Sequence, residues 1–248
     1  MAPMENYLEY TALAWFLFCS AGYTWYAKHH AHKRACLSNT LNLYREDWMR
    51  VMLQRGNRMS DTSVVGNLER NGAFFASSCL LILAGIITAL GYTSEAMEIF
   101  ASMPLSPVPT RQIWELRLLV LMVVFIYAFF KFTWSMRMYN FLAVMIGSAP
   151  LAEDTKTTPA GREAFAKSAG KICDLAGDAF NLGLRSYYYA LSVVAWFFHP
   201  IAFMVASTLI VYVLYRREFH SDALNHLRSG KIFEQPVVAG KTKDKKEG

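Results

Sequence analysis

The stretch NGAFFASSCLLILAGIITALGYTS, residues 71–94, carries no charged side chain and decides the fold class. Residues 10–27 and 186–215 are also uncharged, and a fourth apolar run covers residues 118–130. About 20 apolar residues in a helix cross the hydrocarbon core of a bilayer, where the backbone must satisfy its own hydrogen bonds. The sequence therefore predicts an all-α, polytopic membrane protein with four transmembrane helices. Their expected positions are about 8–27, 71–93, 113–136 and 186–215.

The composition agrees with a single membrane domain. Charged residues make up 18% of the 248 residues, against about 25% in soluble domains. The formal net charge is +6, and the basic residues flank the apolar runs. This placement favours the lipid bilayer and its anionic headgroups, rather than nucleic acid, as their partner. We expect one membrane domain over residues 1–230 and a flexible basic tail over residues 231–248.

The distribution of lysine and arginine predicts the orientation. Residues 28–70 contain eight of them and residues 131–185 contain seven, whereas residues 95–117 contain two and the first ten residues contain none. Because cytoplasmic segments are rich in Lys and Arg, the N-terminus is expected outside the cytoplasm. Four spans return the C-terminus to the outside. A re-entrant hairpin at Pro200 is an alternative that leaves the basic tail inside.

Two segments between the spans are predicted to be amphipathic cytoplasmic helices, at about residues 37–54 and 159–182. In the first, an apolar stripe is opposed by charged residues; the stripe is Leu41, Tyr44, Trp48 and Val51, and the charged residues are Arg45, Glu46 and Arg50. This helix either lies on the membrane surface or packs against the rest of the protein. The second starts at Thr158-Pro159, an N-cap residue followed by proline at the first helical position.

The connection between the second and third spans, residues 93–111, is expected to be irregular. It contains Pro104, Pro107 and Pro109, and prolines at this spacing exclude a regular helix. We therefore predict a short loop outside the cytoplasm.

Several short motifs follow one another along the chain. They are Arg70-Asn71-Gly72-Ala73-Phe74-Phe75-Ala76-Ser77, Phe132-Thr133-Trp134-Ser135-Met136-Arg137, Gly183-Leu184-Arg185, His199-Pro200 and Tyr215-Arg216-Arg217-Glu218-Phe219. In this combination the chain resembles, over roughly residues 5–225, the uncharacterised membrane-protein family catalogued as domain of unknown function 599. The resemblance implies a multi-pass protein of the bacterial inner (plasma) membrane. It implies no particular activity.

His199 and Pro200 form a candidate intramembrane site. They fall near the middle of the uncharged run 186–215, where a polar side chain needs a partner or a water-filled cavity. We expect a neutral His199 to donate a hydrogen bond to a backbone carbonyl, either at the Pro200 kink or on a neighbouring helix. The alternative is a proton relay or a ligand site.

A second candidate is a polar and basic cluster at the cytoplasmic ends of the spans. Its members are Arg70, Asn71, Lys131, Ser135, Arg137, Asn140 and Arg185. They either form a positive collar against lipid headgroups or line a pocket for an anionic ligand. Candidate counter-charges within the chain are Glu69, Asp174 and Asp178.

Other titratable residues are expected to have ordinary roles. His29 and His32, at positions i and i+3, are weak candidates for metal ligands, because no carboxylate lies near them in the sequence. Glu115 and Arg117 are two residues apart and do not face each other on a helix, so each is expected to extend to the outer interface. We predict no metal and no cofactor.

The expected function is a non-enzymatic scaffold or accessory component of a membrane complex, because no catalytic motif is recognisable. The protein is expected to act as a homo-oligomer or with a membrane-protein partner. The alternative is a small oligomeric transporter or channel subunit for a proton or an anionic solute, using His199 and the basic cluster. A membrane enzyme or redox carrier that uses the histidines is a third hypothesis.

Overall fold

A computed structural model describes residues 2–30, 36–101 and 110–230 of the chain. These residues form eight helices and no strand, which confirms the all-α prediction. The helices are α1 (Ala2–His30), α2 (Leu37–Leu53), α3 (Met59–Gly91), α4 (Thr93–Ala101), α5 (Arg111–Ser148), α6 (Pro159–Trp196), α7 (Pro200–Phe219) and α8 (Asp222–Ser229).

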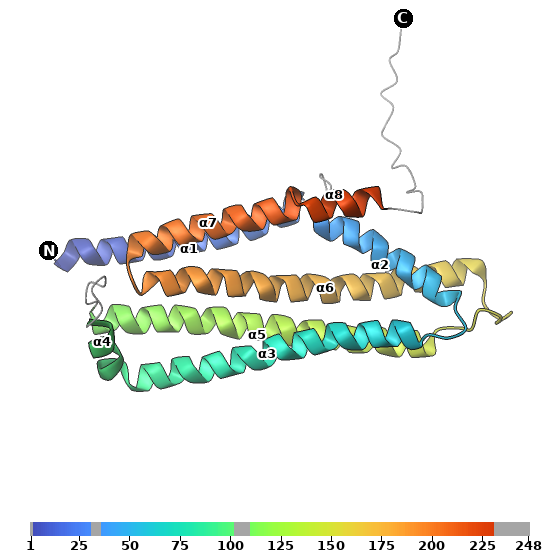
Figure 1. The fold of residues 1–248 in the computed structure, drawn as a ribbon, viewed down its shortest axis with the longest axis horizontal. Coiled ribbons are helices and arrows are strands. Elements are labelled where there is room, and N and C mark those ends of the chain that lie inside the picture. The colour runs from blue at the N-terminus through green and yellow to red at the C-terminus, as the bar shows by residue number, and fades with distance from the viewer. Residues whose placement is uncertain (1, 31–35, 102–109, 231–248) are drawn as a thin grey trace, which may run out of the picture.

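Three long helices, α3, α5 and α6, lie side by side with alternating directions, and α5 is in the middle (Figure 1). Helices α1 and α7 pack together on the side of α6 that faces away from α5. The short helix α4 lies at one end of this arrangement; toward the other end α2 packs on α6, and α8 packs on α2. The two ends of the long-helix arrangement therefore differ: α4 lies at one end and α2 lies toward the other.

The long helices exceed the thickness of a bilayer. Helix α3 has 33 residues and α5 and α6 have 38 each. At 1.5 Å per residue these lengths are about 50 and 57 Å, against a hydrocarbon core of about 30 Å. The excess forms a second hydrophobic core around Met49, Leu142 and Ala169. We call this part the head: α2 with residues 59–70 of α3, 136–148 of α5 and 159–179 of α6.

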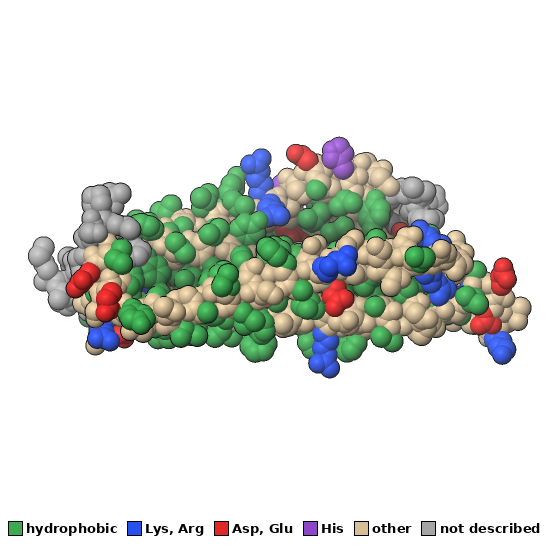
Figure 2. Space-filling view, turned by 60° about the horizontal axis from the view of Figure 1, so that its bottom comes forward, with side chains coloured by type: hydrophobic (Ala, Val, Ile, Leu, Met, Phe, Trp, Pro, Cys, Tyr) green, Lys and Arg blue, Asp and Glu red, His purple; other side chains and the backbone are tan. Residues whose placement is uncertain are grey.

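The rest of the molecule, which we call the apolar bundle, consists of α1, α7 and the remaining parts of α3, α5 and α6. Three helical stretches are long and apolar enough to cross a membrane: Met59–Gly91, Arg111–Ser148 and Pro200–Ser229. On the face in Figure 2, hydrophobic side chains cover the bundle between charged groups near α4 and charged groups toward the head. These features identify a membrane protein.

The predicted single span over residues 186–215 was wrong. Helix α6 ends at Trp196, α7 begins at Pro200, and the two helices pack against each other in opposite directions (Figure 1). Proline lacks the N–H that a continuing helix needs, but it suits the first position of a new one. The residue before it, His199, is extended, with φ −162° and ψ 140°. The uncharged run therefore forms a hairpin at Pro200, as in the alternative arrangement, in place of one kinked helix, and the four-span arrangement is not confirmed.

The expected irregular connection at 93–111 was also partly wrong. Residues Thr93–Ala101 form α4, and the Thr93 hydroxyl donates hydrogen bonds to the carbonyl oxygens of Ala89 and Leu90 in the last turn of α3. The three prolines lie within residues 102–109, outside the described residues.

The two predicted amphipathic helices are present. Helix α6 begins at Pro159, and the Thr158 hydroxyl accepts a hydrogen bond from the Gly161 N–H, as expected for an N-cap. It continues without interruption to Trp196. Helix α2 packs against α6 and α8. Its buried side chains are Thr40, Met49, Met52 and Leu53, so the predicted apolar stripe was misplaced by about one residue position around the helix.

Two glycines of the sequence motifs let α3 and α6 approach α5 closely. A Cβ atom at Gly183 would lie 2.6 Å from a ring carbon of Phe132, and a Cβ at Gly72 would lie 2.9 Å from Cγ of Met136. The Phe132 ring also stacks on Phe75 of α3, with ring centroids 5.2 Å apart. These motif residues therefore hold the three long helices together where the bundle meets the head.

Candidate functional site

At the α4 end, a buried ion pair joins three helices. Arg117 of α5 donates from Nη2 to Glu9 Oε1 of α1 at 2.6 Å. Trp196, the last residue of α6, donates from Nε1 to the other oxygen of Glu9, also at 2.6 Å. Arg117 is only 2% exposed, and its Nη1 donates to the carbonyl oxygen of Phe197. The expectation that Arg117 reaches the outer interface was wrong, because the bundle supplies a carboxylate and an aromatic ring for it.

His199 lies near this pair, at the turn between α6 and α7. Its side chain is exposed, and Nδ1 accepts a hydrogen bond from the Ile201 N–H at 3.1 Å. The expected position in the middle of the membrane was wrong, because the chain reverses direction at this point. The expected donation to a carbonyl is not observed either. His199 caps the N-terminus of α7 by accepting a hydrogen bond.

The predicted polar and basic cluster is dispersed. Buried Ser135 donates to the carbonyl oxygen of Ala176 at 2.8 Å and links α5 to α6. Asn140 donates to Glu69 Oε1 at 3.2 Å and links α5 to α3. The other members, apart from Arg185, contact their own helices or are exposed: Arg70 donates to Asn67, Lys131 lies over the Tyr127 ring, Arg137 lies over the Phe141 ring, and Asn71 is exposed.

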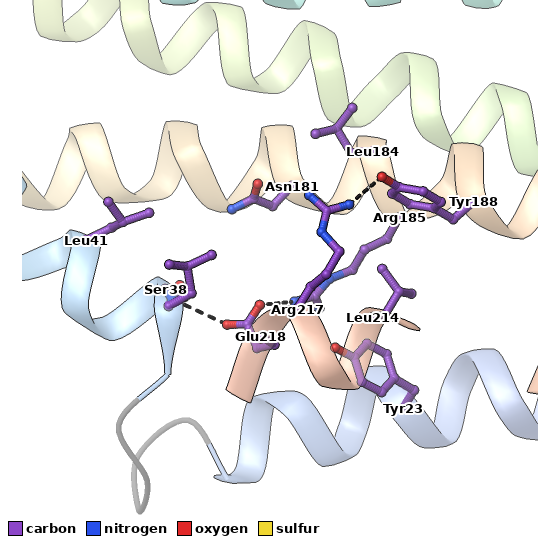
Figure 3. Close-up of a pocket in the computed structure, with 11 residues that line it drawn as sticks. Tyr23, Ser38, Leu41, Asn181, Leu184, Arg185, Tyr188, Leu214, Arg217 and Glu218 are labelled. Atoms are coloured by element: carbon purple, nitrogen blue, oxygen red, sulfur yellow. Dashed lines mark hydrogen bonds and ion pairs between the residues drawn. The ribbon is translucent and has the colours of Figure 1, made fainter. Parts of the chain in front are cut away.

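Arg185, the remaining member, lines a pocket between α1, α2, α6 and α7 (Figure 3). The cavity has a volume of about 80 Å³. Its polar side chains come from segments that are far apart in the sequence; they include Ser38, Asn181, Arg185, Tyr188, Arg217 and Glu218. This pocket is the place where polar side chains of the bundle gather around an open space.

The Arg185–Glu218 pair forms one wall of the pocket. Arg185 Nη2 donates to Glu218 Oε2 at 3.2 Å, and the backbone N–H of Ser38 donates to Glu218 Oε1 at 3.4 Å. Ser38 lies in the first turn of α2, where the helix dipole favours a carboxylate. The Arg185 guanidinium also lies over the ring of Tyr23, 5.4 Å from its centroid. The pair thereby connects α1, α2, α6 and α7.

Arg217 forms the opposite wall. It belongs to the last turn of α7, donates from Nη1 to the Tyr188 hydroxyl of α6, and lies over the Tyr188 ring at 5.4 Å. Its side chain is exposed on one side. Figure 3 shows its guanidinium between Asn181 and Tyr188. Arg217 thus brings a second positive charge to the pocket.

Ion pairs hold α2 on α6 in the head. Arg45 Nη1 lies 2.7 Å from Asp174 Oδ1, and Arg50 Nη2 lies 2.8 Å from Glu163 Oε1. Hydrogen bonding from the Arg50 guanidinium keeps the pKa of Glu163 below its usual range. The charged face of α2 therefore packs against α6, whereas the sequence pattern placed it away from the protein. Packing against α6 therefore explains the amphipathic pattern of α2 without contact with the membrane.

Two further carboxylates in the head accept hydrogen bonds from side chains of α2. Asp178 accepts a hydrogen bond from the Ser38 hydroxyl at 3.0 Å, and burial, with the nearby charge of Asp174, raises its pKa. Asp61 is 1% exposed and accepts from Trp48 Nε1 at 2.7 Å and from Arg55 Nη1 at 2.8 Å. The carboxylates of Asp174 and Asp178 therefore contact α2, rather than the predicted basic cluster.

The histidines proposed as weak metal ligands are not brought together in the described residues. His29 is exposed and stacks on Trp25, with ring centroids 5.2 Å apart. His32 lies outside the described residues. Among the residues that the structure describes, no group of three or more His, Cys, Asp or Glu side chains is arranged to hold a metal ion.

Sequence reasoning missed Glu9 and Trp196 at the α4 end, and Glu218 as the partner of Arg185. One signal was available. Glu9 and Arg117 stand at the same-side ends of two different apolar runs, so the sequence places two opposite charges at one membrane level. Opposite charges at one level in a bundle are candidates for pairing. No comparable signal pointed to Trp196.

The long apolar helices and the packed head define a polytopic helical membrane protein. The chain belongs to the family described as protein of unknown function, DUF599, whose model matches residues 11–223. This confirms the resemblance found in the sequence motifs. Comparisons with curated proteins and with solved structures give no significant match.

Proposed function

We propose that the protein is a non-enzymatic scaffold or accessory component of a membrane complex, which presents its head to a protein partner. The observation that carries this proposal is the continuity of the head with the apolar bundle: α3, α5 and α6 each run through both parts as single helices. A surface on continuous helices is positioned more accurately than one on loops. The head is therefore suited to hold a partner at a fixed height above the bilayer.

The arrangement of the helices supports a topology of five passes, by α1, α3, α5, α6 and α7. We place the N-terminus outside the cytoplasm and the head and C-terminal end inside, in a bacterial-type inner membrane. The hairpin of α6 and α7 supports this choice, because it returns Arg216 and Arg217 to the side of the head. Among the residues that the structure describes, Arg111 and Arg117 are then the only Lys or Arg on the outer side, as the positive-inside rule favours.

Exposed apolar side chains in the head support a protein partner. Phe141 and Val144 lie about one turn apart on α5, beyond Arg137, and are 45% and 71% exposed. Large apolar side chains on a surface that projects from the membrane favour contact with another protein. The partner is either a second copy of this chain or another membrane protein.

A photo-crosslinking amino acid at Val144 tests the scaffold proposal, with the same substitution at Leu81 as the control. Leu81 is 77% exposed in the bundle part of α3 and faces lipid in the proposed topology. We expect protein adducts from Val144 in native membranes and lipid adducts from Leu81. An adduct of twice the mass of the chain identifies a homo-oligomer. Absence of protein adducts both at Val144 and at Leu175, an exposed head residue of α6, would contradict the proposal.

The transporter alternative retains one supporting observation, the Glu9–Arg117 pair within the apolar bundle. Ionisable groups inside membrane helices often belong to ion pathways. Proton flux into liposomes that contain the purified protein distinguishes the two functions. Flux above that of empty liposomes would favour a transporter, whereas a scaffold gives none.

A further inference from the structure

The charged side chains that line the pocket between α1, α2, α6 and α7 do not balance. Arg185 and Glu218 pair with each other, and both carboxylate oxygens of Glu218 already accept hydrogen bonds. Arg217 lines the same pocket, and no carboxylate in the described part of the chain lies within ion-pair distance of it. The pocket therefore carries one positive charge in excess, which favours an anion.

Hydrogen-bond donors in the pocket are also unused. The side-chain amide of Asn181 makes no hydrogen bond to any described residue, although Asn181 is only partly exposed. Arg217 uses one of its five N–H groups on the Tyr188 hydroxyl. That hydroxyl accepts from Arg217, so its own O–H remains able to donate. Arg217, Asn181 and Tyr188 lie next to one another in Figure 3, with the guanidinium in the middle.

The size and position of the pocket restrict the anion. A cavity of about 80 Å³ is several times the roughly 15 Å³ that one water needs, so it accepts a small group of several atoms. Arg217 is exposed, which leaves the pocket open at this side. It lies in the last turn of α7, at the head end of the apolar bundle. Phosphates of lipid headgroups lie at the ends of membrane-spanning helices.

We propose that this pocket binds a phosphate group, with Arg217 as the main charged ligand and Asn181 and Tyr188 as additional donors. The planar guanidinium suits two oxygens of one phosphate. Arg185 is a positioning residue, because it holds Glu218 away from the anion through their ion pair. The phosphate comes either from an anionic phospholipid or from a free phosphate ion. This site does not rest on the scaffold proposal, since it uses bundle residues and no head partner.

The test compares two adjacent arginines of α7. Arg217→Gln removes the pocket charge, whereas Arg216→Gln removes a neighbouring exposed charge that does not line the pocket. Binding of inorganic phosphate to the detergent-purified protein is measured by calorimetry at constant ionic strength. In parallel, retention of phosphatidylglycerol and of phosphatidylcholine is measured by native mass spectrometry. Circular dichroism checks that both variants remain folded.

We expect Arg217→Gln to weaken binding on the order of tenfold or more, as for loss of a charge-assisted hydrogen bond. Asn181→Leu keeps the charge and should weaken binding by a smaller factor, while Arg216→Gln should bind as the unmodified protein does. Dependence of inorganic phosphate binding on Arg217 identifies a free ion as the ligand. Dependence confined to phosphatidylglycerol identifies a headgroup. Equal effects of Arg216→Gln and Arg217→Gln, or no binding of either ligand, would overturn the proposal.

Discussion

Each end of the apolar bundle contains an arginine–glutamate pair beside an aromatic ring, yet the two pairs differ in their surroundings. At the α4 end, Glu9 and Arg117 are buried, with an oxygen–nitrogen distance of 2.6 Å. Toward the head, Arg185 and Glu218 are partly exposed, at 3.2 Å. Each carboxylate accepts a hydrogen bond from one arginine and from one further N–H group. This group is the Trp196 side chain for Glu9 and the Ser38 backbone for Glu218.

The surroundings decide what each pair does. Glu9 and Arg117 balance each other inside closely packed helices, so their pairing contributes to holding α1 against α5 and α6. The pair of Arg185 and Glu218 borders a cavity that also contains Arg217, so a positive charge remains for a ligand. The same two side-chain types therefore serve helix packing at one end, and, in our proposal, a binding site at the other.

The largest effect is expected from Glu9→Gln, which leaves the buried Arg117 without a counter-charge. Breaking one partner of a buried ion pair costs about 3–5 kcal/mol. Loss of stability is measured as thermal unfolding of the detergent-purified protein. The control is Glu115→Gln, which breaks the exposed pair of Glu115 with Arg111 and should cost at most about 1 kcal/mol. Equal losses in the two variants would show that the α4-end pair is not buried as described.

An intermediate effect is expected from Gly170→Ala in the head. The new Cβ would lie 2.9 Å from Cγ and 3.0 Å from Cα of Glu46, so α2 must move away from α6. Overpacking of this kind costs about 1–3 kcal/mol. Hydrogen exchange in α2 should become faster, while exchange around Glu9 should stay unchanged. Gly85→Ala is the control, because a Cβ at Gly85 meets no atom within 4 Å. Unchanged exchange in α2 would contradict the close contact.

A smaller effect is expected at the turn that leads into α7. His199→Ala removes the side chain that accepts from the Ile201 N–H, and loss of an N-cap costs about 1 kcal/mol. His199→Asn should recover most of the lost stability, since asparagine is a good N-cap residue. Thermal unfolding of the two variants measures the difference. Equal destabilisation by alanine and asparagine would argue against the capping role.

Small effects of opposite sign are expected from two carboxylates of the head, and the first variant is Asp178→Asn, beside the pocket. Burial raises the folded-state pKa of Asp178, so its ionised form is unfavourable in the folded protein. This cost is absent at pH values below the unfolded-state pKa, about 3.9, and is fully present above the folded-state pKa. Asparagine keeps an acceptor for the Ser38 hydroxyl. We expect the variant to melt slightly higher than the unmodified protein at neutral pH, and at the same temperature in acid.

Glu163→Gln provides the opposite sign in the same experiment. The folded-state pKa of Glu163 is lowered by Arg50, so its ionised form contributes stability above the unfolded-state pKa, and this is lost as pH falls through the folded-state pKa. Because Glu163 is well exposed, the effect should be small. The variant should melt slightly lower at neutral pH. The same sign in both variants would contradict the assigned environments.

The sequence predicted those parts of the fold that depend on local pattern. The apolar run at 113–136 lies within α5, the run at 71–93 lies in α3 except for its last two residues, and the helix at 37–54 corresponds to α2. The run at 186–215 was not resolved by pattern, because an uncharged stretch of this length fits one kinked helix or two short ones equally well. Packing of α7 against α1 and α6 decides between them, and such contacts are not encoded in local spacing.

The candidate sites were harder to predict for the same reason. The position of His199 in the sequence placed it in mid-membrane, whereas the hairpin moves it to an exposed turn. Arg185 was identified as part of a polar cluster, but its partner Glu218 lies on α7, whose direction was wrong in the prediction. The errors at His199 and Glu218 thus followed from one error in chain direction, whereas the error at Arg117 came from its unrecognised partner Glu9.

The direction of α7 is the central claim, and cysteine labelling tests it most directly. His199→Cys and Ser221→Cys are made separately in a cysteine-free background and exposed to a membrane-impermeant maleimide in intact cells. The hairpin places position 199 at the α4 end and position 221 at the head end. We predict labelling of His199→Cys from outside, and labelling of Ser221→Cys only after the membrane is permeabilised. Labelling of Ser221→Cys in intact cells would contradict the account.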